Sequence, residues 1–382
     1  MNVQSTRLSL LFGVMLAVLL SGCSRQPDKV VIGVALSVQN HEAVHLAVDE
    51  INRAGGIEGV PLELAGMDWR FRDAGQASEI LQWAERFANT KDLVAVIGHS
   101  DSASTLSGAA FYNQHRVPQI VTIATSPAIT NVGNWTYRLC LSDAKQGPAL
   151  ARYAVEKWGK KRIATFYVND DYGRGVAQMF EQEVRRLGGA IVSSVMHRNL
   201  LRPEDQQLIS STIERLYGEA QPELFALFQR EEAANWTIEE IRRSGSKAEI
   251  LGGDTLGTVE FLKSPPLEAQ GIRFSQFFVP DTSSPRAAKF VADYQRRAGD
   301  LPGYGQAFAY DAVFLLAEAV REAGFSRDDV KSYLDALIED KRRIEGVGGT
   351  YTLGPDHDGR RDIYIAEVRD GGYKVLTRLP VD

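Results

Sequence analysis

Cysteine is scarce in this sequence, with only Cys23 and Cys140 among 382 residues. Two cysteines cannot provide the disulfide framework on which many small exported proteins depend, so side-chain packing must hold the chain together. Cys140 lies between apolar neighbours in the stretch YRLCLSD. We therefore expect it to be a buried strand residue rather than a reactive thiol.

The chain also lacks an excess of positive charge. Its formal net charge is -6 with both signs scattered along the sequence, whereas a nucleic-acid-binding face needs clustered Lys and Arg. Paired C-x-x-C and G-x-x-x-x-G-K-[ST] motifs do not occur, and the stretch PDHDG (355–359) has too few oxygen ligands for a calcium loop. We expect no metal, no cofactor and no nucleic-acid partner.

Long hydrophobic runs are missing except near the N-terminus, where Arg7 is followed by the apolar stretch 8–20 and then by Ser21-Gly22-Cys23. This order is typical of a secretory signal (1–23) with a lipobox, and it predicts cleavage with lipid attachment to Cys23. A retained membrane anchor is the less favoured alternative, because the run is short for a bilayer. We expect an exported body tethered by lipid, in the periplasm or at the cell surface, and which membrane holds it stays open.

Apolar strand-like runs alternate with segments of helical period through most of the remaining chain, whose length favours two domains. Strands are predicted at 30–35, 62–66, 93–98, 119–124, 162–168, 190–196, 224–228, 249–253 and 275–280, with a β-rich tail at 349–354 and 363–368. Helices are predicted at 42–53, 76–90, 104–114, 147–158, 173–187, 204–216, 231–244, 285–298, 305–323 and 326–339. The alternation predicts α/β architecture with parallel sheets covered by helices on both faces.

The order of motifs resembles the type I periplasmic binding proteins of the branched-chain amino-acid (Leu/Ile/Val) group, the solute receptors of ABC importers. The stretches that carry the resemblance run from AVDEINRAGGIEGVPLEL (47–64) through VIGHSDSAST (96–105), VPQIVTIATSPAIT (117–130), YRLCLSDAKQGPALARYA (137–154), YVNDDYGRG (167–175), ILGGD (250–254) and FAYDAV (308–313) to GTYTLGPDHDG (349–359). The resemblance implies a monomer that captures an amino acid or a related amide or acid and delivers it to permease subunits in the membrane.

The resemblance also implies the fold: two Rossmann-like lobes that close around the ligand and are joined by three crossing strands, near 143, 279 and 345. The N-terminal lobe is expected to comprise 29–143 and 280–345. The C-terminal lobe is expected to comprise 144–279 and 346–382.

Loops that follow the strands of an open α/β sheet are where such folds bind ligands. In the first lobe, Ser102 matches the family's carboxylate-binding serine at a helix start, where amide groups and the helix dipole favour an anion. Thr125 matches a threonine that bonds both ends of an amino acid, and Ile123 matches a position that uses its backbone carbonyl. Helix capping is the alternative role for Ser102 and Thr125.

In the second lobe, Tyr172 matches an aromatic residue that covers the ligand, and Asp254 matches the acid that pairs with an α-ammonium group. A buried acid is costly without a partner, which favours a cationic or strongly hydrogen-bonding ligand group. Helix capping is the alternative for Asp254. Phe228 matches a pocket-lining aromatic, with ordinary core packing as its alternative.

Three departures from the family pattern bear on the ligand. The loop after the first strand, LSVQNHEA (36–43), is short, and within it Asn40 and His41 are expected at an exposed helix start near the pocket rim. Asp254 is one methylene shorter than the usual glutamate, and Gly305 occupies a position where some relatives have tyrosine. Specificity for leucine therefore does not follow from the resemblance.

An enzymatic alternative rests on Gly98-His99-Ser100-Asp101-Ser102, which is one residue away from the G-x-S-x-G nucleophile elbow, with Asp356 and His357 following late in the chain. The elbow needs glycine where this chain has Ser102, because the turn leaves no room for a side chain. His357 lies in a turn-forming stretch between two tail strands. We therefore expect a binding protein without catalytic residues; a ligand sensor or cell-envelope scaffold of the same fold is the alternative to transport.

Overall fold

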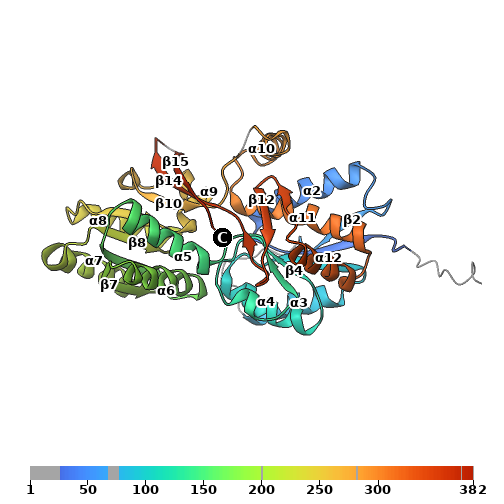
Figure 1. Cartoon of the computed structure of the whole chain (residues 1–382), viewed down its shortest axis with the longest axis horizontal. Coiled ribbons are helices and arrows are strands. Elements are labelled where there is room, and N and C mark those ends of the chain that lie inside the picture. The colour runs from blue at the N-terminus through green and yellow to red at the C-terminus, as the bar shows by residue number, and fades with distance from the viewer. Residues whose placement is uncertain (1–25, 68–76, 199–200, 281–282, 371, 382) are drawn as a thin grey trace, which may run out of the picture.

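The computed structural model describes residues 26–67, 77–198, 201–280, 283–370 and 372–381. The predicted signal, the lipobox and Cys23 lie outside these residues. Two lobes lie side by side along the long axis of the molecule (Figure 1). None of the helices in the described ranges is both long enough and apolar enough to cross a membrane.

The N-terminal lobe is built on a five-stranded parallel sheet with the order β2-β1-β3-β4-β5. Its strands are β1 (Val30–Ala35), β2 (Leu62–Ala65), β3 (Leu93–Gly98), β4 (Gln119–Val121) and β5 (Thr136–Arg138). Its helices are α2 (His41–Arg53), α3 (Ala77–Asn89), α4 (Ser102–Gln114), α10 (Pro285–Ala298), α11 (Tyr304–Ala323) and α12 (Arg327–Glu339), with short 3-10 turns η1 (Val38–Asn40) and η2 (Ile129–Asn131).

Both faces of this sheet are covered, which is why β1 and β3 are hydrophobic throughout rather than alternating with polar residues. Successive side chains of a strand point to opposite faces. Val30 and Ile32 of β1 accordingly pack with α2, α10, α11 and α12, whereas Val31 packs with α3 and with Tyr112 of α4.

The C-terminal lobe contains a seven-stranded sheet with the order β15-β14-β10-β9-β8-β6-β7. Strands β6 to β10 run parallel, and β14 and β15 add an antiparallel edge. The strands are β6 (Arg162–Val168), β7 (Ala190–His197), β8 (Leu224–Phe228), β9 (Glu249–Gly252), β10 (Arg273–Gln276), β14 (Ile363–Arg369) and β15 (Gly372–Leu379).

Helices cover both faces of this second sheet as well. They are α5 (Asp143–Arg152), α6 (Asp171–Arg186), α7 (Pro203–Arg215), α8 (Glu231–Arg243) and α9 (Val259–Lys263), with single turns η3 (Tyr153–Lys157), η4 (Leu216–Ala220), η5 (Asp254–Gly257) and η6 (Leu267–Ala269). Helices α5 and α6 pack on one face, and α7 and α8 pack on the other. The two covered sheets, one parallel and one parallel with an antiparallel edge, confirm the predicted α/β fold of two Rossmann-like lobes.

The chain crosses between the lobes three times. The first crossing lies between β5 and α5 and the second between β10 and α10. The third does not lie near 345 as expected, because β11 (Ile344–Gly346), β12 (Gly349–Leu353) and β13 (Gly359–Arg360) form a small sheet on the N-terminal lobe. The chain passes to β14 only after Arg360.

Long-range contacts explain the late third crossing. Asp311 of α11 is buried and accepts hydrogen bonds from the backbone N–H groups of Val347 (2.8 Å) and Gly348 (3.0 Å). The guanidinium of Arg361 lies 3.8 Å from the centroid of the Phe308 ring, also on α11. These contacts hold the small sheet against α11, so 346–360 belong with the N-terminal lobe.

The start of α2 also differs from expectation. Asn40 and His41 are buried, at 3% and 8% exposure, rather than exposed at a helix start. The turn η1 folds this segment inward: Asn40 Nδ2 donates to Ser37 Oγ (3.0 Å), and His41 Nε2 lies 3.0 Å from the carbonyl oxygen of Leu36. Cys140 is buried as predicted, although it lies just beyond β5 rather than within a strand.

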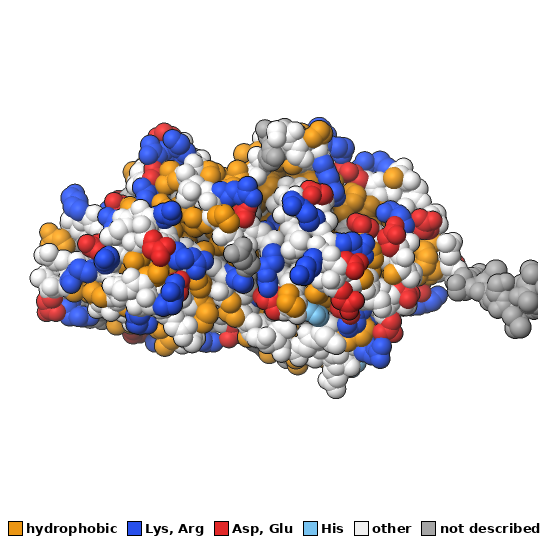
Figure 2. All heavy atoms as spheres, viewed as in Figure 1, with side chains coloured by type: hydrophobic (Ala, Val, Ile, Leu, Met, Phe, Trp, Pro, Cys, Tyr) orange, Lys and Arg blue, Asp and Glu red, His pale blue; other side chains and the backbone are white. Residues whose placement is uncertain are grey.

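The surface carries both signs of charge. On the face shown in Figure 2, Lys and Arg side chains are interspersed with Asp and Glu over both lobes. This face therefore offers no extended basic patch of the kind that a nucleic acid requires.

Candidate functional site

Loops at the carboxyl ends of strands from both lobes meet in one place. Ser102 begins α4 after β3, and Thr125 follows β4 in the first lobe. In the second lobe, Tyr172 lies in the first turn of α6 after β6, and Asp254 begins η5 after β9. Open α/β sheets bind ligands at the carboxyl ends of their strands, and each lobe turns this edge of its sheet toward the other lobe.

A small, deep cavity of about 20 Å³ lies at this meeting point, with room for about one water-sized group. Five of the six predicted site residues line it: Ser102, Ile123, Thr125, Tyr172 and Asp254. It is also lined by Ser100, Asp101, Ala124, Arg230, Thr255 and Tyr304.

The start of α4 forms one side of the cavity. Asp101 caps the helix by accepting from the backbone N–H (2.9 Å) and hydroxyl (2.6 Å) of Ser104. The Ser102 hydroxyl accepts from the backbone N–H of Ser126 (3.3 Å), which fixes the α4 start against the loop that carries Thr125. The N–H groups of the first helical turn lack partners within the helix, so this end attracts a carboxylate.

Asp254 lines the other side of the cavity, and a second buried carboxylate, Asp143, and the amide of Gln146 lie behind it. Gln146 Nε2 donates to Asp143 Oδ1 (2.8 Å) and to Asp254 Oδ1 (3.0 Å). Gln146 Oε1 in turn accepts from Ser275 Oγ (2.5 Å) and from the backbone N–H of Asp254 (3.1 Å). Both donors and both acceptor positions of this amide are used, so it holds the two acids in a fixed arrangement.

Hydrogen bonds from the first lobe reach both acids. Thr125 Oγ1 donates to Asp143 Oδ2 (2.9 Å), and Tyr304 Oη, at the start of α11, donates to Asp254 Oδ2 (3.0 Å). Both bonds join the lobes at the cavity. A solute that enters between the lobes competes for them, which couples its binding to the relative position of the lobes.

Neither acid has a cationic partner in a described ion pair. Burial, and then the negative charge of Asp254, raises the pKa of Asp143 well above its usual range. Burial also raises the pKa of Asp254, in spite of the hydrogen bonds that it accepts from Gln146 and Tyr304. A positive group placed beside Asp254 in the cavity would favour the ionised forms of both acids.

An aromatic and an arginine close the C-terminal side. Tyr172 Oη lies 3.2 Å from Thr255 Oγ1, which donates to the backbone carbonyl of Gln229 (2.8 Å). The guanidinium of Arg230 lies 5.3 Å from the centroid of the Tyr172 ring and is paired with Asp170 (3.0 Å). The cation thus holds the ring in place while its own charge is neutralised.

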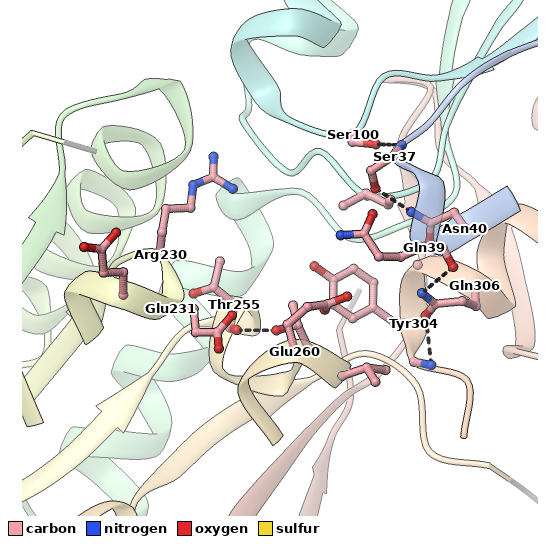
Figure 3. A pocket seen from close by; sticks show the side chains of 16 residues that line it. Ser37, Gln39, Asn40, Ser100, Arg230, Glu231, Thr255, Glu260, Tyr304 and Gln306 are labelled. Carbon is pink, nitrogen blue, oxygen red and sulfur yellow. Dashed lines mark hydrogen bonds between the residues drawn. The ribbon is translucent and has the colours of Figure 1, made fainter. Parts of the chain in front are cut away.

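A larger cavity of about 360 Å³ continues outward from the deep one and shares with it Ser100, Ile123, Arg230, Thr255 and Tyr304. In Figure 3, Arg230, Glu231 and Thr255 lie on one side of this outer cavity, and Ser37, Gln39 and Asn40 on the other. Its remaining lining residues are Glu232, Thr258, Val259, Glu260, Gly303, Gly305 and Gln306.

A family model described as periplasmic binding protein matches residues 35–373. The chain belongs to the periplasmic binding protein family. A Leu/Ile/Val-binding protein homologue from Brucella melitensis is 26% identical over 85% of this periplasmic binding protein and 84% of its own length.

Solved structures agree with this membership. An ABC transporter substrate-binding protein from Desulfitobacterium hafniense in complex with Leu superposes with a TM-score of 0.77 at 26% identity, covering 91% of this chain and all (100%) of its own. A leucine-binding protein from Thermotoga maritima gives a TM-score of 0.81 at 22% identity, covering 92% and 99% of the two chains, which supports the fold.

Phe228 is the predicted site residue that does not line either cavity of this periplasmic binding protein. Its side chain is fully buried and packs edge-on against Phe180 of α6, with ring centroids 5.2 Å apart. It lies behind Gly253, where an added Cβ would come within 3.3 Å of the Phe228 ring. Phe228 therefore belongs to the core and supports the wall of the site from behind. This position agrees with ordinary core packing, the alternative to a pocket-lining role.

The residues of the nucleophile-elbow pattern have other contacts. Ser100 Oγ accepts a hydrogen bond from the backbone N–H of Ser37 (2.6 Å). His357 stacks on the Tyr137 ring at 4.6 Å between centroids, and its Nδ1 lies 3.2 Å from the carbonyl oxygen of Thr136. The described hydrogen bonds do not join Ser100 to His357, and members of this family are binding proteins.

Helix α2 begins with His41-Glu42-Ala43-Val44-His45, so the expectation that the sequence contains no H-E-x-x-H motif is wrong. The hydrogen bond between His41 Nε2 and the Leu36 carbonyl occupies one nitrogen of the first histidine. Within the described residues, no group of three His, Cys, Asp or Glu side chains is placed to hold a metal ion. A spacing alone does not supply the third ligand that zinc requires.

The residues at or behind the cavity that were missed from the sequence include Asp143, Gln146, Arg230 and Tyr304. The first two lie within the stretch 137–154 that carries the resemblance, three residues apart at the start of a helix. That spacing places both on one helix face and could have indicated a shared site. Arg230 and Tyr304 each lie at a helix start, and no spacing in the sequence marks either of them as a site residue.

Proposed function

We propose that this periplasmic binding protein is an exported lipoprotein, anchored through Cys23, that captures an α-amino acid between its lobes and delivers it to an ABC permease. The observation that carries the proposal is the pairing of opposite chemistries at one cavity. The start of α4 with Ser102 and Thr125 suits a carboxylate, and Asp254 on the facing lobe suits an ammonium group. The names of the relatives and the leucine complex support an amino-acid ligand.

Lobe closure on ligand binding follows from the fact that both lobes contribute residues to the cavity. A ligand that touches both lobes binds the closed arrangement better than the open one and therefore shifts the population toward closure. Thr125, Asp143, Asp254 and Tyr304 exchange part of their mutual hydrogen bonding for ligand contacts in this step. A permease that recognises the closed form would then receive the loaded protein.

A thermal-shift screen of the purified protein tests the proposal. An L-α-amino acid at about 1,000 times its dissociation constant should stabilise the fold by roughly 4 kcal/mol. The matched controls keep the leucine side chain and lack one of its two head-group charges: 4-methylpentanoate lacks the ammonium group, and isopentylamine lacks the carboxylate. Because each end of the head group has its own site, both controls should give much smaller shifts. No shift with any amino acid would reject the amino-acid assignment.

Ligand affinity should fall as pH is lowered. Burial raises the pKa of Asp254 above 3.8, so its carboxylate is protonated at a higher pH than in the unfolded chain. The protonated acid does not attract ammonium, and the affinity is therefore lost as pH falls through the raised pKa. Calorimetry at pH 7.5 and pH 4.5 measures this loss, and Asp254→Asn should flatten the dependence if Asp254 causes it.

A further inference from the structure

The outer cavity is the place where the solute's side chain would lie, and this inference rests on the proposed function. The deep cavity, at about 20 Å³, is bordered by the groups that suit an amino-acid head group, and the outer cavity, at about 360 Å³, adjoins it through shared walls. Because the deep cavity has room for about one water-sized group, a head group fits there only when the hydrogen bonds from Thr125 and Tyr304 to the two acids give way, and its remaining atoms then project outward. The walls of the outer cavity should then determine which amino acid binds.

Those walls are acidic. Glu231, Glu232 and Glu260 line the outer cavity, and none of them forms an ion pair with another described residue. Burial raises the pKa of Glu231, and the negative charge of Glu260 raises it further. The two carboxylates are therefore close enough to repel each other. The cation of this wall, Arg230, is already paired with Asp170.

An unsatisfied hydrogen-bond acceptor in the same cavity also favours a ligand that carries N–H groups. Asn40 is 3% exposed and lines the outer cavity, and its Oδ1 has no hydrogen-bond donor among the described residues. The Nδ2 group of Asn40 donates a hydrogen bond to Ser37 Oγ. Oδ1 stands over Gly305, where an added Cβ would approach it to 2.8 Å, so the glycine leaves room for this oxygen at the cavity wall. A buried acceptor without a donor is costly, and a ligand N–H would satisfy it.

Helix electrostatics alone does not explain these features. Glu231 and Glu232 occupy the first turn of α8, where acidic residues stabilise the helix dipole. Glu260 likewise lies in the first turn of α9, but helix dipoles do not account for the meeting of these carboxylates at one cavity or for the Asn40 acceptor. An aliphatic side chain in this cavity would leave the carboxylates and Asn40 Oδ1 without partners, and an anionic one would be repelled.

We propose that the solute is an α-amino acid whose side chain ends in a cationic, donor-rich group, an ammonium or a guanidinium, held in the outer cavity by Glu231, Glu260 and Asn40. Gln39, which reaches into the cavity from the N-terminal lobe in Figure 3, can accept a further N–H. Basic amino acids are the class that meets both requirements, the α-amino-acid head group and the distal cation.

Calorimetric titration with L-arginine, L-lysine, L-leucine, L-glutamine and L-glutamate tests this. Arginine or lysine should bind at least tenfold more tightly than leucine and glutamine, and glutamate should bind most weakly. The double variant Glu231→Gln and Glu260→Gln should lose at least tenfold in affinity for the basic ligand while its affinity for leucine changes little. Glu268→Gln, an exposed glutamate of the same lobe, serves as the matched control and should change neither.

The outcomes separate the two proposals. Leucine binding as tightly as arginine, or an unchanged arginine affinity in the double variant, would overturn the cationic side chain and leave the amino-acid receptor standing. Failure of all five amino acids to bind would overturn both. The double variant removes like charges from one cavity, so it should stay folded, and its unfolding temperature without ligand checks this directly.

Discussion

Replacing Asp254 by asparagine is expected to weaken α-amino-acid binding by between about 30-fold and several thousandfold. Removing one member of a buried, hydrogen-bonded charge pair typically costs about 2–5 kcal/mol, and each 1.4 kcal/mol is about tenfold in affinity. Asparagine keeps the shape of the side chain and an oxygen for Gln146, so the change isolates the charge. Calorimetric titration with the tightest-binding amino acid measures the loss.

The same substitution should not destabilise the protein without ligand. Asp254 is buried beside Asp143, and removing one of two like charges from a desolvated site relieves repulsion. We expect an unchanged or higher unfolding temperature together with the lost affinity, a pattern typical of residues kept for function rather than stability. Asp28→Asn, at an exposed position, is the control. An affinity that stays within a factor of three in Asp254→Asn would exclude ammonium pairing by this residue.

Arg138 is expected to give the largest loss of stability, about 3–5 kcal/mol on replacement by methionine, because the change leaves Asp358 buried without its cation. Arg138 has no exposed surface; its Nε donates to Asp358 Oδ1 (2.8 Å), and its Nη2 lies 2.6 Å from the same oxygen. Urea unfolding of Arg138→Met measures the loss. The exposed pair of Lys263 and Asp300 is the comparison, and Lys263→Met should cost at most about 1 kcal/mol.

Arg138 also bears on ligand binding, because its Nη1 donates to the carbonyl of Ser126 (2.8 Å) and lies 3.4 Å from that of Ala124. These residues flank Thr125 in the site loop. Adding Asp358→Leu to Arg138→Met should recover much of the stability, since two apolar residues replace the ion pair. It should not recover affinity, because the loop carbonyls stay unbound. Recovery of both would show that Arg138 acts on stability alone.

The sequence predicted the alternating strands and helices well because that pattern is local. Each buried strand is a run of apolar residues and each helix has its own period, so β1, β3, β6 and β8 could be located without knowing their neighbours. The third crossing could not be located in this way. It depends on contacts between α11 and the segment after it, made by Asp311 and Arg361, which no local pattern encodes.

The same distinction applies to the site. Ser102, Ile123, Thr125, Tyr172 and Asp254 follow strands, and strand ends are visible in the sequence. The burial of Asn40 was missed because a short polar loop is normally exposed, whereas here α11 lies over it. Tyr304 was missed because its role depends on a crossing that brings α11 to the cleft. Contacts between lobes are a property of the assembled fold.

The division of the N-terminal lobe along the chain has a consequence for the order in which it folds. Strands β1 to β5 are complete by residue 138, but α10, α11 and α12, which cover one face of their sheet, begin only at residue 285. A chain that emerges N-terminus first therefore has only α2 to cover this hydrophobic sheet face while the whole of α5 to α9 is produced. The lobe that begins first is completed last, and during that interval its apolar face is the surface that a chaperone would have to shield.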